Sequence, residues 1–181
     1  MTRSYRTLFA GVAALALAAV ASAQDRVFPV IQGYGGVRPS PTADNRPDPK
    51  LDYKVVFNIT KATPGGAGNV SLGKVARFLN LLGEDNIRPA PGKVVAIVQH
   101  EATPIVLSDA AFAKHFPGRT NPDKDLIARL KAAGAQVHVC AQALAGQGYD
   151  PSEVSPDVVV DDSALTTLAN LQLKGYALIP D

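Results

Sequence analysis

The chain has 181 residues, a formal net charge of +2 and a single cysteine. One cysteine excludes an internal disulfide, and a nearly balanced charge gives no clustered positive face of the kind that nucleic-acid binding requires. The length fits one ordinary domain that buries its own core.

The first residues are typical of a secretory signal peptide. Arg3 and Arg6 precede an apolar run over 8–20, and Ala21-Ser22-Ala23 follows as a small-x-small cleavage pattern. A membrane-spanning helix needs about 20 apolar residues, more than this run supplies. We therefore expect residues 1–23 to be a cleaved signal peptide. The mature protein is then periplasmic or secreted, and it has no membrane association after cleavage.

The signal peptide accounts for the excess of positive charge. Its removal takes away two of the 18 basic residues and none of the 16 acidic ones, so the remaining 158 residues have a formal charge of zero. Association with the phosphate backbone of DNA or RNA depends on lysine and arginine side chains in excess. We therefore expect no nucleic-acid partner.

Residues 24–50 are predicted to form an irregular N-terminal arm. They contain five prolines and three glycines and show neither helical nor strand periodicity. Unlike a disordered linker, the arm also carries several apolar side chains: Val27, Phe28, Val30, Ile31 and Tyr34. We expect it to pack along the domain or against a neighbouring subunit.

Residues 51–181 are predicted to be one α/β domain, which begins with a strand over 53–59 and a glycine-rich turn over 64–68. Apolar residues then recur at helical spacing: Leu72, Val75, Ala76, Leu79 and Leu82. The continuous apolar run over 94–98 is typical of a strand buried on both faces, as parallel strands are. Helices are therefore expected on both sides of the sheet.

Two helix start signals follow in the middle of the domain. Ser108 is a suitable N-cap for a short helix over 109–116. Asn121-Pro122 opens a second helix, which Gly134 ends. A third core strand over 135–139 then leads to Cys140.

The last part of the domain continues the alternation. We predict a short helix over 141–148, a strand over 158–160 and a final strand over 176–179. The helix before the final strand is expected to turn three residues inward: Leu165, Leu168 and Leu171. Sustained alternation of strand and helix predicts a parallel sheet wound on both faces.

Two glycine-containing segments resemble nucleotide-binding loops, and neither meets the requirements. In the segment over 68–75, Val75 stands where a phosphate loop needs Ser or Thr after the lysine to hold magnesium. The glycines of the arm lie outside any strand-turn-helix unit. Three scattered histidines and one cysteine also lack the short spacings of a zinc site. We expect no cofactor and no metal.

Cys140 carries the most reactive side chain of the chain. Binding groups of an open parallel sheet gather beyond the carboxyl ends of the strands, and Cys140 lies at such an end. A helix that starts after it would favour the thiolate, the nucleophilic form. The alternative is that Cys140 is buried as a small hydrophobic residue. An unpaired thiol in an oxidising compartment is a liability unless it is buried or used, so both interpretations stay open.

The histidines allow a similar choice. His100 ends the second core strand and could enter the same crevice as Cys140, as a partner for a thiolate or a bound anion. A histidine at a strand end is more often a hydrogen-bonded structural residue. His138 shares a strand face with Cys140 and is interpreted as packing. His115 is interpreted as an exposed helical residue.

Three segments resemble a known family in their order and spacing: LKAAGAQVHVCAQAL over 130–144, SALTTL over 163–168 and GYALIP over 175–180. From about residue 51 onward the chain resembles the DsrE/DsrF-like (YchN-like) family. The GYGG sequence over 33–36 in the arm is similar to that of exported members.

The resemblance implies a flavodoxin-like three-layer fold with a mostly parallel sheet of about five strands, often assembled into homo-oligomeric trimers or hexamers. Cys140 matches the cysteine that sulfur-relay members use to carry sulfur as a persulfide. His100 lies where members often have a His-Gly pair, with Glu101 in place of the glycine. Gln142 matches the last residue of a common Cys-Gly-Gln sequence, with Ala141 in its middle place.

Two functions are compatible with these residues. The first is a periplasmic thiol protein that accepts or presents sulfur on Cys140, with His100 and Gln142 as binding neighbours and a sulfur donor or acceptor protein as partner. The second is a non-catalytic oligomeric module that binds a small molecule while Cys140 only packs. Family membership does not by itself make the protein an enzyme.

Overall fold

The structure is a computed structural model that describes residues 26–63 and 67–181. The predicted signal peptide and part of the predicted turn over 64–68 lie outside the described residues. Five parallel strands form one sheet in the order β4-β3-β2-β1-β5. Their bounds are Val55–Ile59 for β1, Val94–Val98 for β2, Gln136–Cys140 for β3, Val158–Asp161 for β4 and Ala177–Ile179 for β5. The predicted α/β class and parallel sheet are confirmed.

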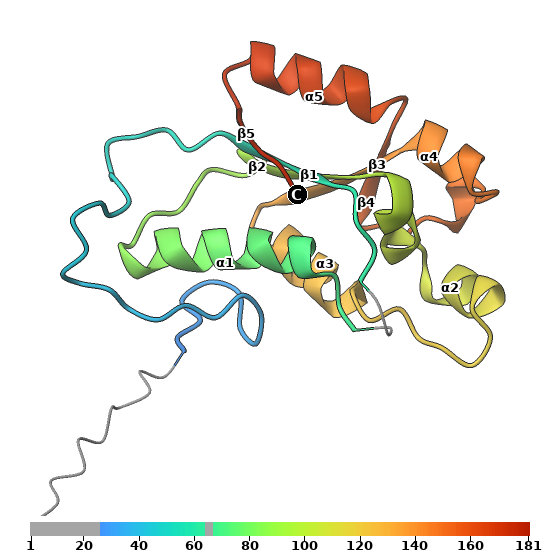
Figure 1. Cartoon of the computed structure of the whole chain (residues 1–181), viewed down its shortest axis with the longest axis horizontal. Coiled ribbons are helices and arrows are strands. Elements are labelled where there is room, and N and C mark those ends of the chain that lie inside the picture. The colour runs from blue at the N-terminus through green and yellow to red at the C-terminus, as the bar shows by residue number, and fades with distance from the viewer. Residues whose placement is uncertain (1–25, 64–66) are drawn as a thin grey trace, which may run out of the picture.

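Helices cover both faces of the sheet, as predicted (Figure 1). On one side lie α1 (Val70–Glu84) and α3 (Lys124–Ala132), and on the other lies α5 (Ala164–Leu173). Shorter elements surround the ends of β2 and β3: η2 (His100–Val106), α2 (Asp109–His115), α4 (Ala141–Gly146) and η3 (Pro151–Glu153). No helix within the described residues has both the length and the apolar character to cross a membrane.

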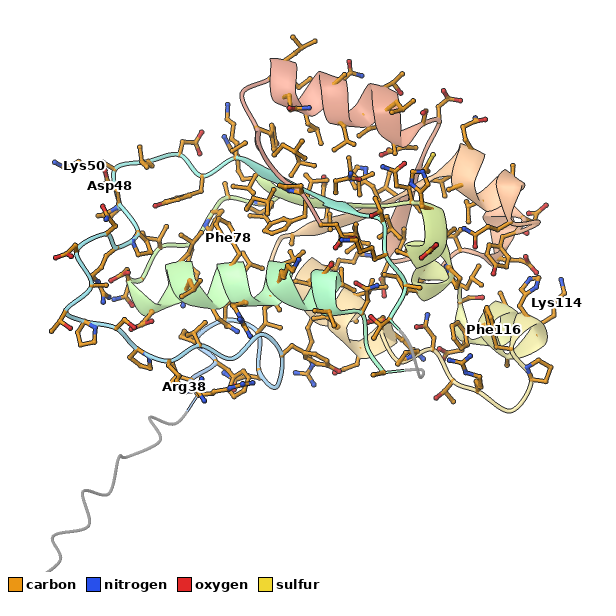
Figure 2. The ribbon with its side chains drawn as sticks, in the orientation of Figure 1. Arg38, Asp48, Lys50, Phe78, Lys114 and Phe116 are labelled. Carbon is orange, nitrogen blue, oxygen red and sulfur yellow. The ribbon has the colours of Figure 1, made fainter. Side chains whose placement is uncertain are left out.

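The larger core lies between the sheet and the pair α1 and α3. All five apolar residues predicted to face inward from α1 are buried. Phe78 points from α1 toward the sheet (Figure 2), where its ring meets the Phe57 ring edge-on with centroids 5.7 Å apart. Asn69 caps α1 by accepting hydrogen bonds from the backbone N–H groups of Ser71 and Leu72.

The two predicted helix starts in the middle of the domain differ in detail. Ser108 caps α2 as expected, because its hydroxyl accepts a hydrogen bond from the N–H of Ala111. Asn121 is buried but lies three residues before α3. Its side-chain nitrogen donates to the carbonyls of Ile105 and Leu107, and its Oδ1 accepts a hydrogen bond from the N–H of Asp123 at 3.0 Å. Asn121 therefore fixes the end of η2 and also holds the turn that leads into α3.

The arm packs along the domain through a buried asparagine on α1. The side-chain oxygen of Asn80 accepts hydrogen bonds from the backbone N–H groups of Val30 and Ile31 at 2.9 and 2.8 Å. Its side-chain nitrogen donates to the carbonyls of Tyr34 and Gly35 at 2.8 and 3.2 Å. Ile31 is itself part of the main core. The described part of the arm is therefore built into the domain.

Gly35 shows why the arm approaches α1 so closely. Its φ of +59° lies in the left-handed region, and a Cβ at this position would come within 2.2 Å of the backbone nitrogen of Arg77. Tyr34, next to it, donates a hydrogen bond from its hydroxyl to Asp125 on α3 at 3.0 Å. The arm thus spans both helices of this face.

The face under α5 is less completely covered. Ala164 and Leu168 of α5 pack on Val56, Val95 and Ile97. The prediction that Leu165 faces inward is wrong, since its side chain is 76% exposed. Leu168 is buried as predicted, and Leu171 is partly buried. Further large apolar side chains are exposed on β4, α5 and β5: Val159, Val160, Leu173 and Leu178.

Candidate functional site

A cavity of about 480 Å³ lies beyond the carboxyl ends of β2 and β3. It is lined by Gln99, His100, Cys140, Gln142, Ala143, Gly146, Gln147, Ser163 and Leu165. All three residues predicted to form the site, namely Cys140, His100 and Gln142, therefore line one cavity. The reason is topological: β2 and β3 are neighbours in a parallel sheet, so their carboxyl ends meet at one edge.

Cys140 borders both the cavity and the small core under α5. It ends β3 and directly precedes α4, and it is only 4% exposed. Its apolar neighbours include Val56, Ile97 and Leu168. Within the described residues no N–H of α4 donates a hydrogen bond to the sulfur. The expected direct support of the thiolate by the first turn of α4 is therefore not observed.

His100 occupies a strained turn at the mouth of the cavity. Its φ is +51°, a left-handed value that a non-glycine residue rarely adopts. Its side chain is exposed, while its backbone carbonyl accepts hydrogen bonds from Thr103 Oγ1 at 2.7 Å and from Gln147 Nε2. Strain of this kind is often found at binding and catalytic sites, where the surrounding structure maintains it.

The two departures from the family sequence fit the backbone. Among the described residues, Glu101 is not one of the positions with positive φ, so a glycine is not required after His100. Ala141 is the first residue of α4, where alanine is a favourable residue. Gln142 donates a hydrogen bond from Nε2 to the carbonyl of Asp162 at 3.2 Å, and thus joins α4 to the segment before α5.

The sequence interpretation missed a histidine-carboxylate pair beside Cys140. His138 does not simply pack: its Nδ1 lies 2.9 and 3.0 Å from the two carboxylate oxygens of Asp161. Asp161 is the partner of Cys140 in the register between β3 and β4, so all three side chains belong to the same face of the sheet. Both members of the pair are largely buried. Only the strand register reveals this pairing.

His115 is also more involved than expected. It is partly buried rather than fully exposed, and its Nε2 lies 3.0 Å from Glu153 Oε2. Hydrogen bonds from Lys114 and His115 lower the pKa of Glu153 to about 2. The ring of His115 packs edge-on against Tyr149. These contacts tie α2 to η3 and lie outside the cavity that Cys140 lines.

In residues 26–63 and 67–181 no three His, Cys, Asp or Glu side chains are grouped closely enough to hold a metal ion.

The model of the DsrE/DsrF-like family matches residues 53–180. The chain belongs to the DsrE/DsrF-like family. The match covers every strand and helix of the sheet domain, including the segment around Cys140.

The chain is similar to two solved structures. The protein of unknown function MTH1491 from Methanobacterium thermoautotrophicum is 19% identical, with a TM-score of 0.54, and the match covers 72% of this chain and 100% of that one. The ychN protein from E. coli is 15% identical, with a TM-score of 0.49 and a match over 71% of this chain and 99% of that one. No curated protein matches. The likeness to MTH1491, together with the parallel sheet between helices, confirms the predicted flavodoxin-like fold.

Proposed function

We propose that this protein is an exported carrier of sulfur, which Cys140 holds as a persulfide. The observation that carries the proposal is the cavity at the carboxyl edge of the sheet. It joins the chain's single cysteine to His100, Gln142 and Gln147. The chain belongs to the DsrE/DsrF-like family, and the resemblance to that family implies a sulfur-carrying cysteine at this position. The partner is a protein that donates or accepts sulfur, and the working form is a homo-oligomer.

The chemistry needs no oxidant and no cofactor. The thiolate of Cys140 attacks the terminal sulfur of a donor persulfide, so that a new S–S bond forms on Cys140. The S–S bond of the donor breaks, and the donor leaves as a thiolate that takes up a proton. Transfer to an acceptor thiolate reverses the same step. The oxidation state of the transferred sulfur is unchanged.

The surrounding side chains have distinct parts in this proposal. His100 faces the cavity and can donate a hydrogen bond to the terminal sulfur of the persulfide. Asp161 is paired with Cys140 in the register between β3 and β4. By itself, the negative charge of the Asp161 carboxylate would disfavour a thiolate on Cys140. His138 Nδ1 lies within hydrogen-bond distance of both oxygens of that carboxylate and fixes its orientation, which makes His138 a positioning residue.

A sulfur-loading experiment tests the proposal. Incubation of the mature, folded protein with a small persulfide donor should add one sulfur atom, which mass spectrometry assigns to Cys140. Cys140→Ser should remove the addition completely, and His100→Ala should shorten its lifetime. His115→Gln, outside the cavity, serves as the matched control. Wild-type protein that stays unmodified under conditions that load a free cysteine peptide would overturn the proposal.

The low exposure of Cys140 also supports the second candidate function. A cysteine that only packs under α5 leaves a cavity of about 480 Å³ for a small molecule bound by the polar side chains around it. In that case Cys140→Ala would bind the same small molecules as the wild type. For the sulfur carrier, Cys140→Ala abolishes loading while the fold is retained.

A further inference from the structure

Cys140 has a polar neighbour on each side of it in the sheet. On one side, Asp161 of β4 is its partner in the register. On the other side, the last paired residues are Val98 of β2 and Val139 of β3, and the backbone of Gln99 stays extended. Gln99 therefore comes level with Cys140 on the same face of the sheet, where neighbouring strands lie about 4.8 Å apart. Both residues line the cavity at this edge.

The Gln99 side chain is buried, and its two polar atoms are used differently. It is 7% exposed, so more than nine-tenths of it is enclosed. Its Nε2 donates a hydrogen bond to Oδ1 of Asn58 on β1 at 2.7 Å. Within residues 26–63 and 67–181 no donor reaches Oε1, whereas every fully enclosed side-chain polar atom there has a partner. Oε1 therefore keeps an accessible face, and the open space that Gln99 meets is the cavity of Cys140.

The other carboxamides of the cavity have the same orientation. Gln142 and Gln147 donate from Nε2 to the backbone carbonyls of Asp162 and His100. Because a carbonyl only accepts, the side-chain nitrogens serve the protein and the oxygens are left for a ligand. None of the residues that line the cavity is a lysine, arginine, aspartate or glutamate, and each of them has both of its chain neighbours among the described residues. The cavity therefore offers mainly uncharged acceptors.

We propose that Gln99 is a specificity-determining residue for the sulfur donor, and that its Oε1 accepts a hydrogen bond from an amide N–H beside the donor's sulfur. This inference rests on the proposed carriage of sulfur by Cys140. A cysteine persulfide within a peptide has an amide N–H on each side of its side chain. The cavity of about 480 Å³ lies in the range that holds organic molecules, roughly 300–1,000 Å³. An oxyanion such as thiosulfate has no N–H to donate to Gln99.

Two isosteric, neutral donors test the proposal on the full folded protein. The first is the persulfide of N-acetylcysteine N-methylamide, and the second is that of methyl 2-acetoxy-3-sulfanylpropanoate, in which oxygen replaces both N–H groups. Mass spectrometry gives the rate at which each donor loads Cys140, and division by the rate for a free cysteine peptide removes intrinsic reactivity. We expect the wild type to prefer the amide by about fivefold or more. Gln99→Met, which has a similar size and no acceptor oxygen, should bring this ratio close to one.

The ratio separates a role in recognition from a role in folding. A substitution that only loosens the structure changes loading from both donors alike and leaves the ratio as it is. Gln172→Met, on the exposed side of α5 and outside the cavity, is the matched control and should keep the wild-type ratio. Equal loading of the wild type by the two donors, or a preference that survives Gln99→Met, would refute the role of Gln99 and leave the sulfur carrier intact. Failure of both donors to load Cys140 would instead overturn the sulfur carrier, and the role of Gln99 with it.

Discussion

The face of the sheet under α1 and α3 differs from the face under α5 in how it is covered. Among the described residues, 21 buried residues form the cluster on the first face, which includes Ile31 of the arm. The cluster on the second face has six, and Cys140 is one of them. Figure 1 shows α5 alone over its face, while two helices and the arm lie on the other side.

The two faces therefore contribute differently to the stability of the fold and to the chemistry of the candidate site. Burial of apolar area stabilises a fold by about 25 cal/mol per Å², so the first face contributes most of the stability. The second face keeps a cysteine, a histidine-carboxylate pair and a cavity at its edge, with fewer apolar contacts to constrain them. Substitutions should therefore act on stability at the first face and on reactivity at the second.

Asn80→Ala should give the largest loss of stability. The substitution removes hydrogen bonds to two N–H groups and three carbonyls of the arm, all of them buried or partly buried, and leaves these groups without the Asn80 side chain as a partner. We expect the free energy of unfolding to fall by at least about 3 kcal/mol in urea titrations. Asn170→Ala on the exposed side of α5 is the matched control, with an expected change within about 0.5 kcal/mol. Similar losses for both variants would contradict the comparison of the two faces.

Asp123→Asn should raise stability above pH 6. Burial raises the pKa of Asp123 to about 6, so the native state retains a proton that the unfolded state releases near pH 4. The wild type therefore loses stability as the pH rises from about 4 to 6, by up to about 3 kcal/mol. Thermal unfolding across this range should show the loss in the wild type and a flat profile in the variant. A variant that is less stable at pH 7 would refute this account.

Asp181→Asn should have a smaller and opposite effect. Burial raises the pKa of Asp181, but hydrogen bonds from Ser71, Thr60 and Lys61 outweigh it and lower the pKa to about 2. The stability that this carboxylate contributes is present above pH 4 and is lost as the pH falls toward 2. We expect about 1–2 kcal/mol at pH 7, after allowance for solvent screening. The variant should be less stable than the wild type at pH 7 and nearly equal to it at pH 2.

Leu165→Ser should have the smallest effect on stability. The Leu165 side chain is largely exposed on α5, so its replacement should change the free energy of unfolding by less than about 0.5 kcal/mol. Leu168→Ala, one turn further along the helix and buried, should cost about 2 kcal/mol or more. Equal losses in chemical denaturation would mean that α5 is covered on both sides in solution, as in an oligomer.

The strands and most helices are predictable from the sequence because burial sets their periodicity. The run over 94–98 is apolar since β2 is buried on both faces. The orientation of α5 is not predictable in the same way, because its apolar residues spread over more than half of its circumference and spacing does not single out Leu165 or Leu168. The structure decides through the contacts of Ala164 and Leu168 with β1 and β2.

The candidate site is predictable in part for a related reason. Cys140 ends one strand and His100 follows its neighbour, and the carboxyl ends of parallel strands share one edge. The pairing of His138 with Asp161 depends on the register of β3 with β4, which a single sequence does not display.

The most direct test of the central claim is the labelling of Cys140 by iodoacetamide in the native, mature protein. If the thiol opens to the cavity, labelling should proceed under conditions where the protein stays folded, and low concentrations of urea should not accelerate it. Labelling that occurs only as fast as the protein unfolds would show a cysteine enclosed in the core, and would contradict the sulfur-carrier proposal.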